Sequence, residues 1–261
     1  VTSFANPGVN RARIGNHVQR QDRAWSVSDL EELVEDAAVA NQVATAKSKK
    51  LIELRRDMAS VIGSDQANVA GGSGSAAKCR GMGQWVLNSA QTNNPVPAGF
   101  RTPSASINTT AAASFAESDV NGVLESIYSQ TGTLENFKLF AGTSLKKEFS
   151  DFSRTGGPNG VYRVNEDVST NKITRNVLRY EGDFGTLDVI TDLFLAKDGS
   201  AASQGMRGYV INPDLVEIAF ADGPSHYDLE DEGGGPRGFY KAWYTLRVKN
   251  PLGLGKFAAT A

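Results

Sequence analysis

The stretch of residues 28–62, SDLEELVEDAAVANQVATAKSKKLIELRRDMASVI, decides the fold expected of this chain. Ser28 is followed three residues later by Glu31, a capping-box pattern that is typical of a helix start. Neither Pro nor Gly interrupts the stretch before Gly63. The sequence therefore predicts one unbroken helix over residues 28–62, and about 35 residues at 1.5 Å each would make it roughly 50 Å long.

Apolar residues recur along this stretch at spacings that place side chains on one helical face. One stripe contains Leu30, Ala37, Ala44, Leu51 and Met58, and a second contains Leu33, Ala40, Leu54 and Val61. One narrow face is therefore expected to be buried. Because a compact chain of this length has a radius of gyration of only about 18 Å, the sequence predicts a subunit that is flattened or elongated along the helix.

Charge is segregated along the same stretch. The acidic residues at its beginning are Asp29, Glu31, Glu32, Glu35 and Asp36, and the basic residues toward its end are Lys47, Lys49, Lys50, Arg55 and Arg56. This order complements the helix dipole at both ends. A solvated helix surface is the simpler interpretation, and the alternative is that the two blocks meet neighbouring subunits.

Composition is that of a soluble globular chain, with 261 residues of which 40% are hydrophobic and 21% charged. This length suffices for one large or two modest domains. A net charge of −2 argues against a dedicated nucleic-acid-binding protein, which needs a concentrated basic surface. The single cysteine, Cys79, cannot form an intrachain disulfide, and without a secretory signal or a long apolar span we expect folding in a reducing cytoplasm.

The rest of the chain predicts an α+β fold. Helices are expected over residues 118–130 and 143–152, and a strand over residues 137–141. Alternating patterns then predict strands at residues 173–180, 186–194, 209–211, 216–220 and 240–248. Helices followed by mostly antiparallel strands, without regular βαβ alternation, indicate α+β.

Residues 1–25 are poor core material, because arginines outnumber the few apolar residues there. The arginines are Arg11, Arg13, Arg20 and Arg23. Such a segment is either a disordered terminus or an extended arm that becomes ordered only against another chain.

Patterns that carry chemistry are weak in this sequence. The Gly/Ser loop at residues 71–75 lacks the Gly-Lys-Ser/Thr ending of a phosphate-binding loop and reads as a flexible connector. Ser144 and Lys147 match a Ser-x-x-Lys spacing without its companion motifs. His226 stands beside Asp228, Glu230, Asp231 and Glu232, which could form a metal or acid/base site but are better explained as a solvated hairpin connection. The sequence therefore predicts a structural or binding role, with no catalytic residues, cofactor or metal.

Four segments, taken in order, resemble the major capsid (major head) proteins of tailed bacteriophages with the Hong Kong 97-type fold. They are ELRRD at residues 53–57, AAKCRGMG at residues 76–83, YEGDFG at residues 180–185 and YTLRVKN at residues 244–250. The likeness covers roughly residues 26–255 and depends on the order and spacing of the segments.

This resemblance implies a fold with a long spine helix, a peripheral and an axial domain, and an extended loop and N-terminal arm that reach neighbours. Residues 1–25 would form the arm with part of the extended loop, residues 26–100 the peripheral domain, residues 101–205 the axial domain, and residues 206–261 the return to the peripheral sheet. Family members normally carry more chain before the spine. Either maturation removed a segment here, or part of the protein is not represented.

The resemblance also implies a function. Copies would assemble in the bacterial cytoplasm into hexamers and pentamers of an icosahedral virion head, which would enclose double-stranded DNA without sequence-specific contacts. Portal, scaffolding, protease or decoration proteins would be its partners, and no membrane would be involved. The expected subunit-interface residues are Arg11, Arg13, Arg20, Arg23, Trp25, Glu31 and Glu35.

Three alternatives stay open at this point. A cellular encapsulating shell of the same fold would hold a protein cargo in place of DNA. A cytoplasmic hydrolase would use His226 and its acidic neighbours. A monomeric binding module would not assemble at all.

Overall fold

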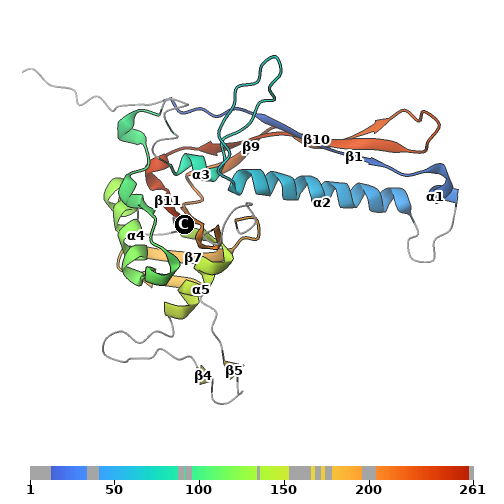
Figure 1. Ribbon diagram of the computed structural model, residues 1–261. Helices are drawn as coiled ribbons and strands as arrows, with labels where there is room; N and C mark the ends of the chain where they lie inside the picture. The colour runs from blue at the N-terminus through green and yellow to red at the C-terminus, as the bar shows by residue number, and fades with distance from the viewer. Residues whose placement is uncertain are drawn as a thin grey trace, which may run out of the picture.

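The computed structural model describes residues 13–33, 41–87, 91, 96–133, 136–152, 166–167, 172–173, 178–195 and 204–258. Figure 1 shows a long limb, made of one helix and a narrow sheet, that projects from a broader lobe of sheet and helices. This shape agrees with the elongated subunit that the sequence predicts.

The limb consists of a three-stranded antiparallel sheet and the helix that packs against it. Its elements are β1 (Gln19–Ser26), α1 (Asp29–Leu33), α2 (Gln42–Gly63), β9 (Val216–Leu229) and β10 (Arg237–Val248). The strand order is β1-β10-β9, with Gln19 opposite Tyr244 and Val248 opposite Val216. The α2 helix and the sheet run side by side along the limb (Figure 1).

Packing between α2 and β10 follows from the alternation in the sequence of β10. Ala242 and Tyr244 point to the buried face of the strand and meet Leu54 and Met58 of α2 around the buried Cys79. Each predicted apolar stripe thus contributes one residue to this core, Met58 from the first and Leu54 from the second, whereas Leu51 is only partly buried.

The prediction of one unbroken helix over residues 28–62 is wrong. Its start is confirmed, because Ser28 Oγ accepts a hydrogen bond from the backbone N–H of Glu31 at 3.3 Å. However, Asn41 is extended, with φ −151°, and its side chain accepts from the backbone N–H of Ala44 at 2.8 Å, so that it caps a new helix. An extended residue cannot continue a helix. The 22 residues of α2 span about 33 Å, and residues 34–40 lie outside the described part of the chain.

The lobe is built on a six-stranded mixed sheet of order β2-β11-β8-β3-β7-β6, in which β2–β11 and β3–β7 are the parallel pairs. Its strands are β2 (Ile107–Asn108), β3 (Phe137–Ala141), β6 (Arg179–Gly182), β7 (Gly185–Thr191), β8 (Gly208–Ile211) and β11 (Gly255–Phe257). Its helices are α3 (Met82–Trp85), α4 (Glu117–Thr131) and α5 (Thr143–Phe152), and a separate pair is β4 (Glu166–Asp167) with β5 (Lys172–Ile173). Short 3-10 turns lie at Ala98–Phe100, Ser104–Ser106, Ala112–Ser114, Gln204–Met206 and Pro251–Gly253.

The core of the lobe lies between α4, α5 and one face of this sheet. Val123 and Ile127 of α4 and Phe149 of α5 pack against Leu139 of β3 and Val210 of β8. The helices predicted over residues 118–130 and 143–152 and the strand predicted over residues 137–141 are confirmed.

The strands of the second half are mostly where the alternation predicts them, with two main differences. β9 runs on to Leu229, well beyond the predicted end at residue 220. The structure describes only the two ends of the strand predicted over residues 173–180, and these ends belong to different sheets. β5 pairs with β4, whereas β6 pairs with β7. The Gly/Ser loop at residues 71–75 forms a tight hairpin turn, with Gly72 bridged to Ser75 and Gly74 at φ +91°.

The structure bears on two of the predicted segments, residues 1–25 and residues 206–261. Gln19–Ser26 is a strand of the chain's own sheet, so this part of residues 1–25 is neither a disordered terminus nor an arm ordered only by another chain. Likewise, β8 and β11 belong to the sheet of the lobe although they follow residue 206, where a return to the peripheral sheet is predicted. The division into domains itself stays a prediction.

Candidate assembly interface

The predicted interface arginines have different surroundings. Arg23 forms an ion pair with Asp57 of α2 in the same chain, and Arg20 lies 3.7 Å from Asp22 on its own strand. Arg13 is exposed, and Arg11 lies outside the described residues. Arg23 therefore fastens β1 to α2, whereas Arg13 and Arg20 present charge at the surface.

Trp25, also predicted at a subunit interface, is only 5% exposed within its own chain. Its ring stacks on His226 with centroids 5.8 Å apart, and its Nε1–H donates to His226 Nε2 at 3.2 Å. Lys47 Nζ lies 4.8 Å from the centre of the Trp25 ring. In this subunit Trp25 thus ties β1 to β9 and α2.

The α1 segment exposes large apolar side chains at the end of the limb farthest from the lobe (Figure 1). Leu30 is 73% exposed and Leu33 is 82% exposed, while the neighbouring Asp29 and Glu31 are exposed as well. Leu30 and Leu33 are three residues apart and so share a helical face. Glu35, the last predicted interface residue, lies outside the described part of the chain.

An apolar groove of about 380 Å³ lies where the limb meets the lobe. One wall is the last turn of α2 with the beginning of β9, and the other is the face of the six-stranded sheet that α4 and α5 leave uncovered. The larger apolar side chains that line it are Ile62, Met82, Phe140, Tyr209, Ile211 and Ile218. Sequence reasoning did not find this groove, because its walls come from separate segments of the chain, around residues 59–63, 138–140 and 209–218.

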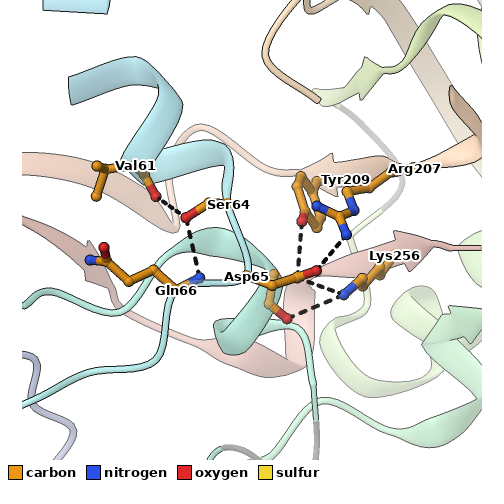
Figure 2. Close-up of polar contacts among 8 residues, drawn as sticks. Val61, Ser64, Asp65, Gln66, Arg207, Tyr209 and Lys256 are labelled. Atoms are coloured by element: carbon orange, nitrogen blue, oxygen red, sulfur yellow. Dashed lines mark hydrogen bonds and ion pairs between the residues drawn. The ribbon is translucent and has the colours of Figure 1, made fainter. Parts of the chain in front are cut away.

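Asp65 joins the limb to the lobe beside this groove (Figure 2). It follows Ser64, whose hydroxyl donates to the carbonyl of Val61 at 2.8 Å and so ends α2. Asp65 Oδ2 lies 2.7 Å from Arg207 Nη2, and Asp65 Oδ1 lies 3.0 Å from Lys256 Nζ. One carboxylate at the end of the limb helix therefore pairs with two cations of the lobe.

The surroundings of Asp65 are closely packed. The Tyr209 hydroxyl donates to Asp65 Oδ1 at 3.4 Å, and Lys256 Nζ also donates to the carbonyl of Gly83 at 3.4 Å. A Cβ atom at Gly83 would lie 1.6 Å from Asp65 Oδ1, so that only glycine fits there. Since Lys256 is 6% exposed, its charge depends on this carboxylate for compensation.

The residues considered for catalysis lie in separate parts of the described fold, and His226 Nε2 is 3.4 Å from Asp228 Oδ1. His226 packs between Trp25 and Tyr240, and Asp231 accepts the backbone N–H groups of residues 233–235, which hold the pKa of its carboxyl below its usual range. Ser144 and Lys147 lie on α5. Among the described residues no cluster of three or more His, Cys, Asp or Glu side chains could hold a metal ion.

Solved structures of phage capsids have a similar fold, and they identify the fold of this chain as the Hong Kong 97-type fold. The chain is similar to the Cyanophage Pam1 capsid asymmetric unit, with 14% identity, TM-score 0.53, and coverage of 99% of this chain and 81% of that one. It is also similar to a structure of Gordonia phage Cozz, with 12% identity, TM-score 0.55, and coverage of 94% and 71%. The capsid of Cyanophage P-SCSP1u gives 11% identity, TM-score 0.53, and coverage of 100% and 80%.

The sequence itself places the chain within this class. The family model of the SU10 major capsid protein matches residues 5–261, and the chain belongs to that family. No curated protein matches it. The family is that of a structural protein of the phage head shell, so the alternative of a cellular encapsulating shell is not favoured.

Proposed function

We propose that copies of this major capsid protein associate into hexamers and pentamers that close into an icosahedral head around double-stranded DNA. The match of the family model over residues 5–261 carries the proposal. The subunit adds physical support, because each copy has a long limb with exposed apolar side chains at one end and an apolar groove at the other. A subunit that touches several neighbours forms a durable shell even when each contact is modest.

The charge of the chain suits this container role. At a net charge of −2 the protein is weakly acidic overall, and a wall without a dominant basic surface would hold DNA without binding it tightly. We expect no sequence-specific contacts with the nucleic acid and no catalytic activity.

The proposal extends to location and organisation. In the shell, the limb would be the peripheral part of the subunit, and the lobe, including β8 and β11, would be the axial part. Assembly would take place in the bacterial cytoplasm, with a portal protein and with scaffolding, protease or decoration proteins as partners. In the described part of the chain, every helix is too short or too polar to cross a lipid bilayer.

Electron microscopy of the purified protein tests the proposal. Closed shells with six-fold and five-fold capsomers are the expected result, and their diameter would give the copy number. Light scattering that finds only single chains under all assembly conditions, with or without a coexpressed portal and scaffold, would overturn it.

A further inference from the structure

We propose that the apolar groove between limb and lobe receives the α1 segment of a second copy, with Leu30 and Leu33 as the inserted side chains. This inference rests on the proposed self-assembly and adds the contact through which two subunits would join.

The positions of the two surfaces require a second copy. The leucines lie at the far end of the limb, while the groove lies at the lobe end of α2 (Figure 1). The 22 residues of α2, about 33 Å of helix, separate the two sites. A chain therefore cannot fill its own groove. A contact between different patches of two identical subunits is heterologous and builds rings or open arrays.

The chemistry of the two surfaces matches. Leucines that are 73% and 82% exposed are costly to leave in water, and burying each side chain would stabilise the contact. The groove offers about 380 Å³ lined mainly by apolar side chains, which is in the size range of sites that bind small apolar groups. Two adjacent side chains from one helical turn would fit there.

Charge at the rim also favours this occupant. Asp29 and Glu31 flank the leucines, and the exposed Arg55 and Arg56 stand one turn before Ala59, which lines the groove. Residues three and four apart share a helical face, so the arginines border the groove entrance. Inside the groove, the charge of Glu217 is already compensated by Arg247 and Lys249 at 2.7 and 3.4 Å.

Disulfide trapping in assembled particles tests the contact directly. The variant Leu33→Cys with Ala59→Cys places one thiol on α1 and one at the groove, and the native Cys79 is fully buried. After mild oxidation we expect a ladder of dimers and higher multimers on a non-reducing gel. The control variant Leu178→Cys with Ala59→Cys, in which Leu178 is 66% exposed on the lobe, should stay monomeric.

Substitution gives a second readout. Leu33→Asp should lower the yield of particles by about tenfold or more, as loss of an interface anchor does, with the circular dichroism of the subunit unchanged. Leu178→Asp should leave the yield unchanged. The inference is overturned if wild-type particles form but the Leu33/Ala59 pair gives no ladder, gives only an intrachain bond, or crosslinks no better than the Leu178 control. Failure of the wild type to form particles would instead count against the proposed function.

Discussion

At the scale of the residue, Asp65 links the end of α2 to two cations of the lobe. Its carboxylate compensates Arg207 and the nearly buried Lys256 at the same time. Removing one partner of a buried ion pair leaves an uncompensated charge, which is far more costly than the loss of an exposed pair. Loss of Asp65 should therefore lower the stability of the subunit and weaken the attachment of the limb to the lobe.

We expect Asp65→Asn to lower the free energy of unfolding by about 2–4 kcal/mol. Chemical denaturation of the unassembled subunit measures this change. Glu217→Gln is the matched control, because Glu217 pairs with Arg247 at 2.7 Å at an exposed site, where such pairs contribute about 1 kcal/mol or less. Equal effects of the two substitutions would contradict the role given to Asp65.

Cys79 gives a prediction for alkaline pH. Burial raises the pKa of its thiol from 9.0 to about 11. The folded state therefore keeps the proton where the unfolded state loses it, so the contribution of Cys79 to stability is complete below pH 9 and is lost as the pH rises toward 11. Over that window the free energy of unfolding should fall by up to about 1.4 kcal/mol per pH unit. Cys79→Ala should show a shallower decline, and parallel pH profiles for the two proteins would refute the assignment.

At the scale of the element, α2 depends on one face. Leu54 is fully buried against β10, whereas Ile52, two residues earlier, is 49% exposed. Leu54→Asp places an unpaired charge in that core and should unfold the subunit, while Ile52→Asp should leave it folded. Circular dichroism with thermal melting distinguishes the two. A soluble, cooperative melt of Leu54→Asp near the wild-type temperature would show that the helix packs elsewhere.

Local sequence signals account for many elements of the fold. The apolar spacing in α4 and α5 and the alternation in β3 and β10 suffice to predict these elements. Each element buries one face, and the pattern of apolar residues shows which face that is. The break at Asn41 was missed because asparagine is tolerated within a helix and its capping bond to Ala44 becomes visible only in the structure. The strand Gln19–Ser26 was missed because its polar residues lie at the edge of the limb sheet, where only Trp25 is buried.

At the scale of the whole molecule, the arginines of the opening segment are still expected to form ion pairs between subunits. Replacing Arg11, Arg13, Arg20 and Arg23 with glutamine should impair assembly, as measured by particle yield in sedimentation, while the subunit stays folded. Because Arg23 already pairs with Asp57 in its own chain, a variant that retains Arg23 separates loss of assembly from loss of stability. An unchanged yield in both variants would argue against these pairs.

The candidate site could not be predicted from the sequence in the same way as the fold class. Gly63, Phe140 and Ile218 become neighbours only when the limb meets the lobe, and Asp65, Arg207 and Lys256 come together for the same reason. No local spacing encodes such contacts. Leu30 and Leu33 begin the two apolar stripes of the sequence, which predict a buried helix face, but the structure leaves both side chains exposed.

The junction of limb and lobe contains the Asp65 ion pairs and an apolar cluster in which Leu246 of β10 packs with Tyr209 of β8. A rotation of about 5° about this junction would carry the far end of α2 through about 3 Å, given its length of about 33 Å. Small adjustments at this junction would therefore be amplified by the length of the limb into different tilts between adjoining subunits. A curved surface needs such differences when one polypeptide must fit both flatter and more sharply curved positions.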